Sequence, residues 1–480
     1  MQHHGKSKKQ RLIKLYATYV LMTFAVAIIS FVCIFFVLGY RVDVKNGDVE
    51  LGALLQFRSY PSDASITLDG EKLAFQTPGK QNVDVGPHTI QMKRSGYHDW
   101  SRTVDVKPSE LRWINYTRFV PKKLVTTTVS SFENLSGGIP SPDKKWFMLL
   151  PFADRPELTL VDLRDDQSVQ QTKLTLPLSS YTSKPDLTHS FELVEWDFGA
   201  RYVLVKHVTG DLIEYLRVDR TNSTATVNIS AKLGIAISDI HFSGTSGNVF
   251  YALESGNIRR LDSLAGTLSQ PIARRVTQFE LYKNDIVAYV RDGDNKTTVV
   301  GMAEGDKTVV VATFDNTVPV YVDVSSYFND NYLAISRGID LVVYKDPQDS
   351  QKKQRVLSSK SSIAASWIAF SNSGRFVLSG MGTQYSMSDL ETAERAEVSL
   401  PGVVNDTTRP PQWIDDFHIV STGAGVARMS EFDGGYQHVL ATVLAGSRVT
   451  LSDDGKLFYS LAKTQSGGYV LQATQMTVQD

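Results

Sequence analysis

The chain has 480 residues, of which 42% are hydrophobic, and a formal net charge of −1 from 50 Lys and Arg against 51 Asp and Glu. This length exceeds one ordinary hydrophobic core, so we expect two or three domains. The balanced charge gives no overall basic field, which argues against nucleic acid as a partner.

A segment without charged side chains covers residues 15–38 and is rich in Phe, Val, Ile, Leu and Ala. About 20 apolar residues cross roughly 30 Å of hydrocarbon as a helix, so the segment predicts one transmembrane helix. Cys33, which lies in this segment, is the only cysteine of the chain. Disulfides and cysteine metal sites are therefore excluded elsewhere. The side chains expected to contact the bilayer and its boundaries are Tyr16, Tyr19, Phe24, Ile28, Phe31, Phe35, Phe36 and Tyr40.

The two flanks of this segment differ in charge. The following flank mixes both signs, whereas the preceding one carries Lys6, Lys8, Lys9, Arg11 and Lys14. The positive-inside rule therefore places residues 1–14 in the cytoplasm as a basic tail and the bulk of the chain outside. The alternative is a cleaved signal peptide, but residues 35–40 lack a small-residue cleavage site, so we expect a retained anchor.

Residues 39–53 are predicted to form a short polar stalk, and residues 54–121 then contain short strands separated by turn signals. Asp69-Gly70 supplies the left-handed backbone of a tight hairpin turn. Because no helical periodicity persists here, the segment predicts a small all-β sandwich. Tyr97 and Trp100 are expected to cover its open end, with stacking on a ligand as the alternative.

Four separated turn motifs in this segment agree in order and spacing with one family: residues 59–70, 77–78, 86–90 and 95–97 resemble the PEGA domain. That family is a small β-sandwich of bacterial and archaeal surface proteins, so the resemblance implies surface attachment or interaction and no catalytic residues. Asp63 stands where the family usually has Gly, so we expect a reshaped turn. The motif residues are Pro61, Ala64, Asp69, Gly70, Thr77, Pro78, Gly86, His88, Gly96 and Tyr97.

From residue 124 to residue 480 a turn followed by an apolar strand recurs. The clearest copy is residues 141–150, followed by a second strand at residues 158–163. The spacing of roughly 40 to 50 residues is that of four-stranded propeller blades, which bury their faces against each other, so we predict a closed β-propeller. We count eight copies, with seven blades as the alternative because residues 281–289 form the faintest copy. The strongest copies resemble blades of Tol-type and WD-like propellers.

Acidic turn residues, including those at 292–295, raise the question of calcium. A calcium loop needs a bidentate acid at its end, and these turns lack one, whereas Asx-type hydrogen bonding explains the same residues. The nucleophile elbow, the phosphate loop and the His-Glu-x-x-His pair are also missing, and the histidines are scattered. The sequence therefore predicts no metal, no cofactor and no catalytic residues.

Propeller glycosidases place carboxylates in the central channel, so acids near the start of a blade copy are the candidates for catalysis. Here they are Glu192, Glu195 and Asp197, and solvated loop charge is the interpretation we favour for them.

The sequence thus predicts a mainly β chain with an N-terminal transmembrane helix, a PEGA-like sandwich and a seven- or eight-bladed propeller. We expect a non-catalytic binding or scaffolding protein on the outer face of a bacterial cytoplasmic membrane, recognising an envelope protein or polysaccharide through propeller loops. One alternative is a propeller hydrolase acting on glycans or peptides. Another is a sensor, for which a tail of some fourteen residues leaves little room.

Overall fold

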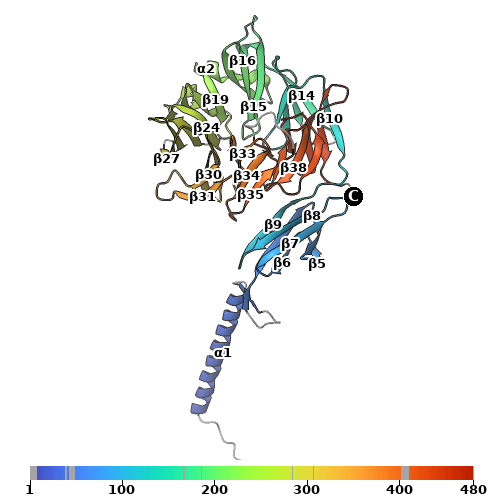
Figure 1. Cartoon of the computed structure of the whole chain (residues 1–480), viewed down its shortest axis with the longest axis vertical. Coiled ribbons are helices and arrows are strands. Elements are labelled where there is room, and N and C mark those ends of the chain that lie inside the picture. The colour runs from blue at the N-terminus through green and yellow to red at the C-terminus, as the bar shows by residue number, and fades with distance from the viewer. Residues whose placement is uncertain are drawn as a thin grey trace, which may run out of the picture. The chain divides into compact units, whose positions relative to one another are not determined.

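The computed structural model describes residues 8–37, 40–42, 49–165, 168–184, 186–283, 285–305, 307–401 and 410–478. The chain divides into two compact units, Met1–Lys123 and Leu124–Asp480. Each unit is described by itself below (Figure 1).

The first unit begins with helix α1 (Lys8–Val37). Within it, residues 14–31 have a mean hydropathy of 1.6 and bury nothing against the protein, so the helix is long and apolar enough to cross a membrane as an anchor or a signal sequence. The helix starts inside the segment predicted as a tail, whose Lys6 lies outside the described residues. Tyr16, Tyr19, Phe24, Ile28 and Phe31 are exposed. The side chains of Phe35, Phe36 and Tyr40 fall outside the description, as do those of Lys8, Lys9 and Arg11.

The segment predicted as a stalk contains secondary structure. Strands β1 (Tyr40–Val42) and β2 (Val49–Leu51) pair antiparallel with each other. The strand β3 that follows starts at Ala53 and belongs to the next fold element.

Seven strands of the first unit form two facing sheets, as predicted for a sandwich. One sheet has the order β6-β3-β9, and the other has the order β5-β4-β7-β8. Between them lie fully buried apolar residues such as Leu55, Ile66, Ile90 and Ile114. The strands are β3 (Ala53–Tyr60), β4 (Ser65–Leu68), β5 (Glu71–Gln76), β6 (Gly79–Val83), β7 (Gly86–Lys93), β8 (Trp100–Val106) and β9 (Leu111–Arg118).

The motif residues of the sandwich hold its turns together. Thr77 is 1% exposed, and its Oγ1 lies 2.6 Å from Ser59 Oγ and accepts from the Ala64 backbone N–H at 3.0 Å. The peptide bonds before Pro61 and Pro78 are cis. Asp63 keeps a left-handed backbone with φ of 63°, so the expected reshaping of this turn was wrong. Asp is one of the residue types that tolerate this conformation.

The hairpin turn at Asp69-Gly70 has positive φ at both residues, as predicted. His88 connects this turn to β7, since its Nδ1 lies 2.6 Å from Asp69 Oδ2 and its Nε2 lies 2.9 Å from Asp84 O. Burial alone would lower the pKa of His88, but these two hydrogen bonds together with the negative charges of Asp69 and Asp84 raise it. His88 therefore has a structural role, because it links the hairpin turn to the backbone at Asp84.

Tyr97 and Trp100 are 2% and 1% exposed, so the alternative of ligand stacking is wrong for this pair. Tyr97 packs near Phe119 with ring centroids 5.9 Å apart, and Trp100 meets Tyr116 edge to face at 6.0 Å. Both rings belong to the core of the sandwich.

The second unit consists of eight sheets in the part of the chain that the structure describes, which settles the blade number at eight. Blade one contains β11 (Gly137–Pro140), β12 (Trp146–Leu150), β13 (Glu157–Asp162) and β14 (Gln170–Thr175). Blade two contains β15 (His189–Trp196), β16 (Tyr202–Thr209), β17 (Leu212–Asp219) and β18 (Val227–Asn228). Blade three contains β19 (Ile237–Phe242), β20 (Val249–Glu254), β21 (Asn257–Asp262), β22 (Thr267–Leu268) and β23 (Ala273–Arg274). Blade four contains β24 (Val276–Tyr282), β25 (Ile286–Asp292), β26 (Thr297–Glu304) and β27 (Lys307–Asp315).

The remaining blades repeat the pattern. Blade five contains β28 (Val320–Tyr327), β29 (Asp330–Arg337), β30 (Asp340–Lys345) and β31 (Gln354–Lys360). Blade six contains β32 (Trp367–Phe370), β33 (Phe376–Met381), β34 (Gln384–Asp389) and β35 (Arg395–Ser399). Blade seven contains β36 (Gln412–Trp413), β37 (His418–Ser421), β38 (Val426–Glu431) and β39 (His438–Thr442). Short helical turns at Leu178–Ser180, Ser223–Ala225 and α2 (Ile229–Leu233) connect strands of the early blades.

The eighth blade closes the ring. Its strands β40 (Thr450–Leu451), β41 (Leu457–Lys463) and β42 (Tyr469–Gln475) are completed by β10 (Thr126–Phe132), which pairs with β42. An apolar cluster also joins the first and last blades. In it, Phe147 and Leu149 of blade one share a core with Leu461 and Leu471 of blade eight. The predicted closed propeller is confirmed by this pairing.

The turns between first and second strands use the acidic residues that raised the calcium question. Asp143 Oδ1 accepts from Ser141 Oγ at 2.5 Å, and Ser141 Oγ accepts from the Trp146 backbone N–H at 3.0 Å. Ser452 and Asp454 repeat the arrangement in blade eight, with 2.7 Å between Ser452 Oγ and Asp454 Oδ1. These hydrogen bonds give the acidic side chains a structural role in each turn.

Candidate functional site

The first strand of each blade borders the axis of the ring, and these eight strands distribute charge unevenly (Figure 1). As the structure bounds them, the eight strands carry no Lys or Arg. Blades two to five form an acidic half of the channel, and the other four blades contribute neutral residues. The five carboxylates are Glu192, Glu195, Asp239, Glu280 and Asp323.

A histidine sits among these carboxylates. His241 Nδ1 lies 2.9 Å from Glu195 Oε2, and its Nε2 lies 3.6 Å from Asp239 Oδ1. Burial alone would lower the pKa of His241, but the two carboxylates raise it well above its usual range. The two carboxylates therefore favour the protonated form of His241, whose charge offsets part of the acidic half.

The other two carboxylates of this half lie on blades four and five. Burial raises the pKa of Asp323 to about 6, although its carboxylate accepts backbone N–H groups of Phe370 at 2.6 Å and Val324 at 2.7 Å. The pKa of Glu280 is also raised, first by the surrounding protein and then by the negative charge of Asp323. An approaching cation would therefore favour the ionised form of these two carboxyl groups.

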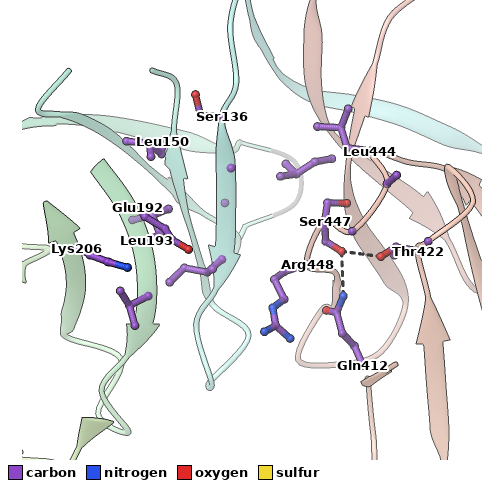
Figure 2. A pocket seen from close by; sticks show the side chains of 18 of the residues that line it. Ser136, Leu150, Glu192, Leu193, Lys206, Gln412, Thr422, Leu444, Ser447 and Arg448 are labelled. Carbon is purple, nitrogen blue, oxygen red and sulfur yellow. Dashed lines mark hydrogen bonds between the residues drawn. The ribbon is translucent and has the colours of Figure 1, made fainter. Parts of the chain in front are cut away.

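A cavity of about 880 Å³ opens on the axis, within the size range of ligand sites. Its lining comes from the first strands of blades one, two, three and seven, from second or third strands of blades one, two, seven and eight, and from loops of blades six to eight (Figure 2). Leucine side chains, represented by Leu150, Leu193 and Leu444, alternate with glycines and hydroxyl groups. Gly137 of β11 leaves open space, since a Cβ added there would meet nothing within 4 Å.

Charges of both signs line this cavity, namely those of Glu192, Asp239, Lys206 and Arg448. Glu192 and Lys206 face each other in the register of β15 and β16, yet no ion pair within 4.0 Å joins them among the described residues. The Tyr215 hydroxyl donates to Ser238 O at 3.1 Å. Burial raises the pKa of Tyr215 to about 12, and the charges of Asp239 and Glu192 add to this effect. Both acids therefore act on the same corner of the cavity.

Arg448 reaches the cavity from a loop that two side chains hold. Gln412 Nε2 donates to Ser447 O at 2.9 Å, and Thr422 Oγ1 donates to the same oxygen at 3.1 Å (Figure 2). Gln412 Oε1 also accepts from the Val449 backbone N–H at 3.0 Å. The hydrogen bonds on both sides of Arg448 fix the backbone that presents its guanidinium to the cavity.

The three acids singled out from the sequence have different roles in the structure. Glu192 lines the cavity, whereas Glu195 is not among the lining residues and pairs with His241 of the next blade. Asp197 is fully buried and accepts the backbone N–H groups of Arg201 and Tyr202 at 2.7 Å each, so it closes the turn between β15 and β16. Sequence reasoning missed Asp239, Glu280, Asp323, Lys206 and Arg448. For Asp239, Glu280 and Asp323, the available signal was an acid in the strand that precedes the first turn of the blade.

Residues 53–119 match the model of the PEGA domain. This segment is a PEGA domain. The match covers all seven strands of the sandwich and confirms the resemblance drawn from its turn motifs. No curated protein matches the chain.

Among solved structures, those similar to the chain include propellers. The Dos1 propeller shares 13% identity over 73% of this chain and 94% of its own, with a TM-score of 0.44. Dihydro-heme d1 dehydrogenase NirN shares 12% identity over 64% of this chain and 67% of its own, with a TM-score of 0.43. An uncharacterized protein of Listeria monocytogenes EGD-e shares 16% identity over 68% of this chain and 94% of its own, with a TM-score of 0.39. The propeller assignment rests on the strand pairing described above.

Proposed function

We propose that the protein is a membrane-anchored, extracytoplasmic binding protein without catalytic activity, whose propeller channel takes a group from an envelope protein or polysaccharide. The cavity of about 880 Å³ carries this proposal, because it combines apolar walls with a few charged groups on a rigid ring. The loop around Arg448 is held by side-chain hydrogen bonds, which limits the ordering that a ligand must impose.

Filling the cavity should abolish binding. In Gly137→Trp the new ring enters open space on β11, where the backbone needs no left-handed conformation. We expect capture of envelope polysaccharide and protein fractions by the full chain, immobilised in detergent, to fall at least about ten-fold, because the site no longer has room for the ligand. The matched variant Gly137→Ala adds only a Cβ and should bind as the natural protein does.

The same experiment separates binding from catalysis. Material eluted at its original size from the natural protein, and missing from Gly137→Trp, supports a binding protein. Shortened polymer or peptide products would favour a propeller hydrolase that uses the channel carboxylates. Equal capture by Gly137→Trp and Gly137→Ala would contradict a binding role for this cavity.

We also propose that the PEGA domain and the propeller lie outside the cytoplasm, which is supported by the charge around α1 and by the PEGA domain, a module of extracytoplasmic proteins. We expect protease added to intact cells to remove the PEGA domain and the propeller while leaving α1 with the membrane fraction. An N-terminal tag should stay protected. Protection of the folded domains until the cells are lysed would contradict this orientation, and a mature chain starting near Tyr40 would show a cleaved signal sequence.

A further inference from the structure

The pattern of charge in the cavity points to a particular class of ligand, an inference that rests on the binding function proposed above. Glu192 and Lys206 lie opposite each other on β15 and β16 without forming an ion pair among the described residues, and both line the cavity. Opposite charges that are adjacent but unjoined each remain available for a group of the ligand.

The carboxylates that line the cavity lie on one side of it. Glu192 and Asp239 line the cavity on blades two and three, and the first strands of blades two and five carry further carboxylates, Glu195 and Asp323. Arg448 lies on the other wall, on the loop that leads into blade eight (Figure 2). The field therefore draws a cationic group towards blades two and three and an anionic group towards blade eight.

The uncharged side chains of the cavity lining indicate which class of ligand fits. Leu193 and Leu444 are partly buried: they pack against the apolar cores between neighbouring blades and also line the cavity, whereas the aromatic rings of the lining, Phe191 and Tyr215, are buried. Sugar rings bind most readily to an exposed aromatic face, which the described lining does not offer. Aliphatic walls between opposite charges suit a peptide.

We propose that the cavity binds an extended peptide segment that carries both a basic and an acidic side chain. The basic side chain lies against Glu192 and Asp239 and points towards the acidic half of the channel. The acidic side chain meets Arg448 on the other wall. Aliphatic side chains of the peptide pack on the leucines.

Three synthetic hexapeptides test this proposal with the full chain in detergent, by isothermal titration calorimetry. The dipolar probe contains Lys, two Leu and Glu between capped glycines. The cationic probe replaces its Glu by Gln, and the anionic probe replaces its Lys by Gln. We expect the dipolar probe to bind at least about ten-fold more tightly than either of the others, with an affinity that falls as salt rises.

Variants assign the two ends of the peptide. Glu192→Gln should weaken the dipolar and cationic probes about ten-fold and leave the anionic probe unchanged, whereas Arg448→Gln should weaken the dipolar and anionic probes. Arg448→Lys should restore part of the loss because it keeps the charge. Glu71→Gln and Lys72→Gln change charge on an exposed strand of the PEGA domain and should have no effect.

Other outcomes would overturn the proposal. Equal affinity of the dipolar and cationic probes would show that the acidic half alone recognises the ligand. Failure of all three probes, while Gly137→Trp still abolishes capture of envelope polysaccharide, would reject a peptide ligand and leave the binding function in place. If all three probes fail to bind and Gly137→Trp also leaves the capture of envelope material unchanged, the cavity is not a binding site.

Discussion

Replacing Arg375 with Met is expected to lower the free energy of unfolding of the propeller by about 3 kcal/mol. Asp389 is 2% exposed, and its carboxylate accepts from Arg375 Nε at 3.0 Å and from Nη2 at 2.7 Å. Without the guanidinium, a negative charge remains buried with only its hydrogen bonds to the 391–392 turn. Urea unfolding followed by tryptophan fluorescence measures the loss.

The pH dependence of this effect has a defined sign. Burial alone would raise the pKa of Asp389, but Arg375 and the turn hydrogen bonds lower it. The pair therefore stabilises the fold above the ordinary carboxyl pKa of about 3.9, and this contribution disappears as pH falls through the lowered value. The difference between the natural protein and Arg375→Met should be largest near neutral pH and shrink below pH about 4.

A matched control comes from blade one. Arg164 forms the same kind of pair with Asp162, but its side chain is 57% exposed. Exposed pairs contribute about 0 to 1 kcal/mol, so Arg164→Met should change the urea midpoint little. Equal losses in the two variants would mean that burial of Asp389 does not set the energetics of its pair.

The seam between the first and last blades should be equally sensitive. Phe147 is fully buried there, in the cluster that also contains Leu461 and Leu471. Phe147→Ala removes a whole ring from a packed interior, so we expect a loss of about 3 to 5 kcal/mol. The exposed Phe328, at 77%, provides the control, and Phe328→Ala should stay within about 0.5 kcal/mol of the natural protein.

The location of Phe147 adds a second readout. If the ring opens at this seam first, hydrogen exchange in Phe147→Ala should accelerate in β10 and β42 before it does in blades four and five. A uniform increase over all blades would instead show that the propeller opens as one cooperative unit. A small loss of stability with unchanged exchange would contradict the importance of the seam.

Much of the propeller was predictable because the second strand of several blades is buried on both faces. Residues 146–150 and 376–380 are continuous buried runs after a turn, which is the pattern that the sequence analysis counted. The same reasoning found the faintest copy, which forms β25 of blade four. Turn chemistry was equally informative in the PEGA domain, where its motifs fixed the sandwich.

The channel was far harder to predict. Its strands vary in length from two residues in β36 and β40 to eight in β15 and β28, and carry no simple alternation of apolar and polar residues. Glu195 and His241 are 46 residues apart and meet only because successive blades pack side by side. Asp197 was a candidate by proximity in sequence, yet a β-bulge between Leu193 and Glu195 and the following turn give it a different environment. Contacts set by ring closure leave no local signal.

The pairing of β10 with β42 also sets an order of events during synthesis. The strand at Thr126–Phe132 emerges from the ribosome first, but its partner at Tyr469–Gln475 is made more than three hundred residues later. Until then the earliest part of the propeller keeps an unpaired edge, which is prone to join other chains. A nascent chain that stops short of its last strand cannot complete the ring, so premature termination near the end yields an open and aggregation-prone product.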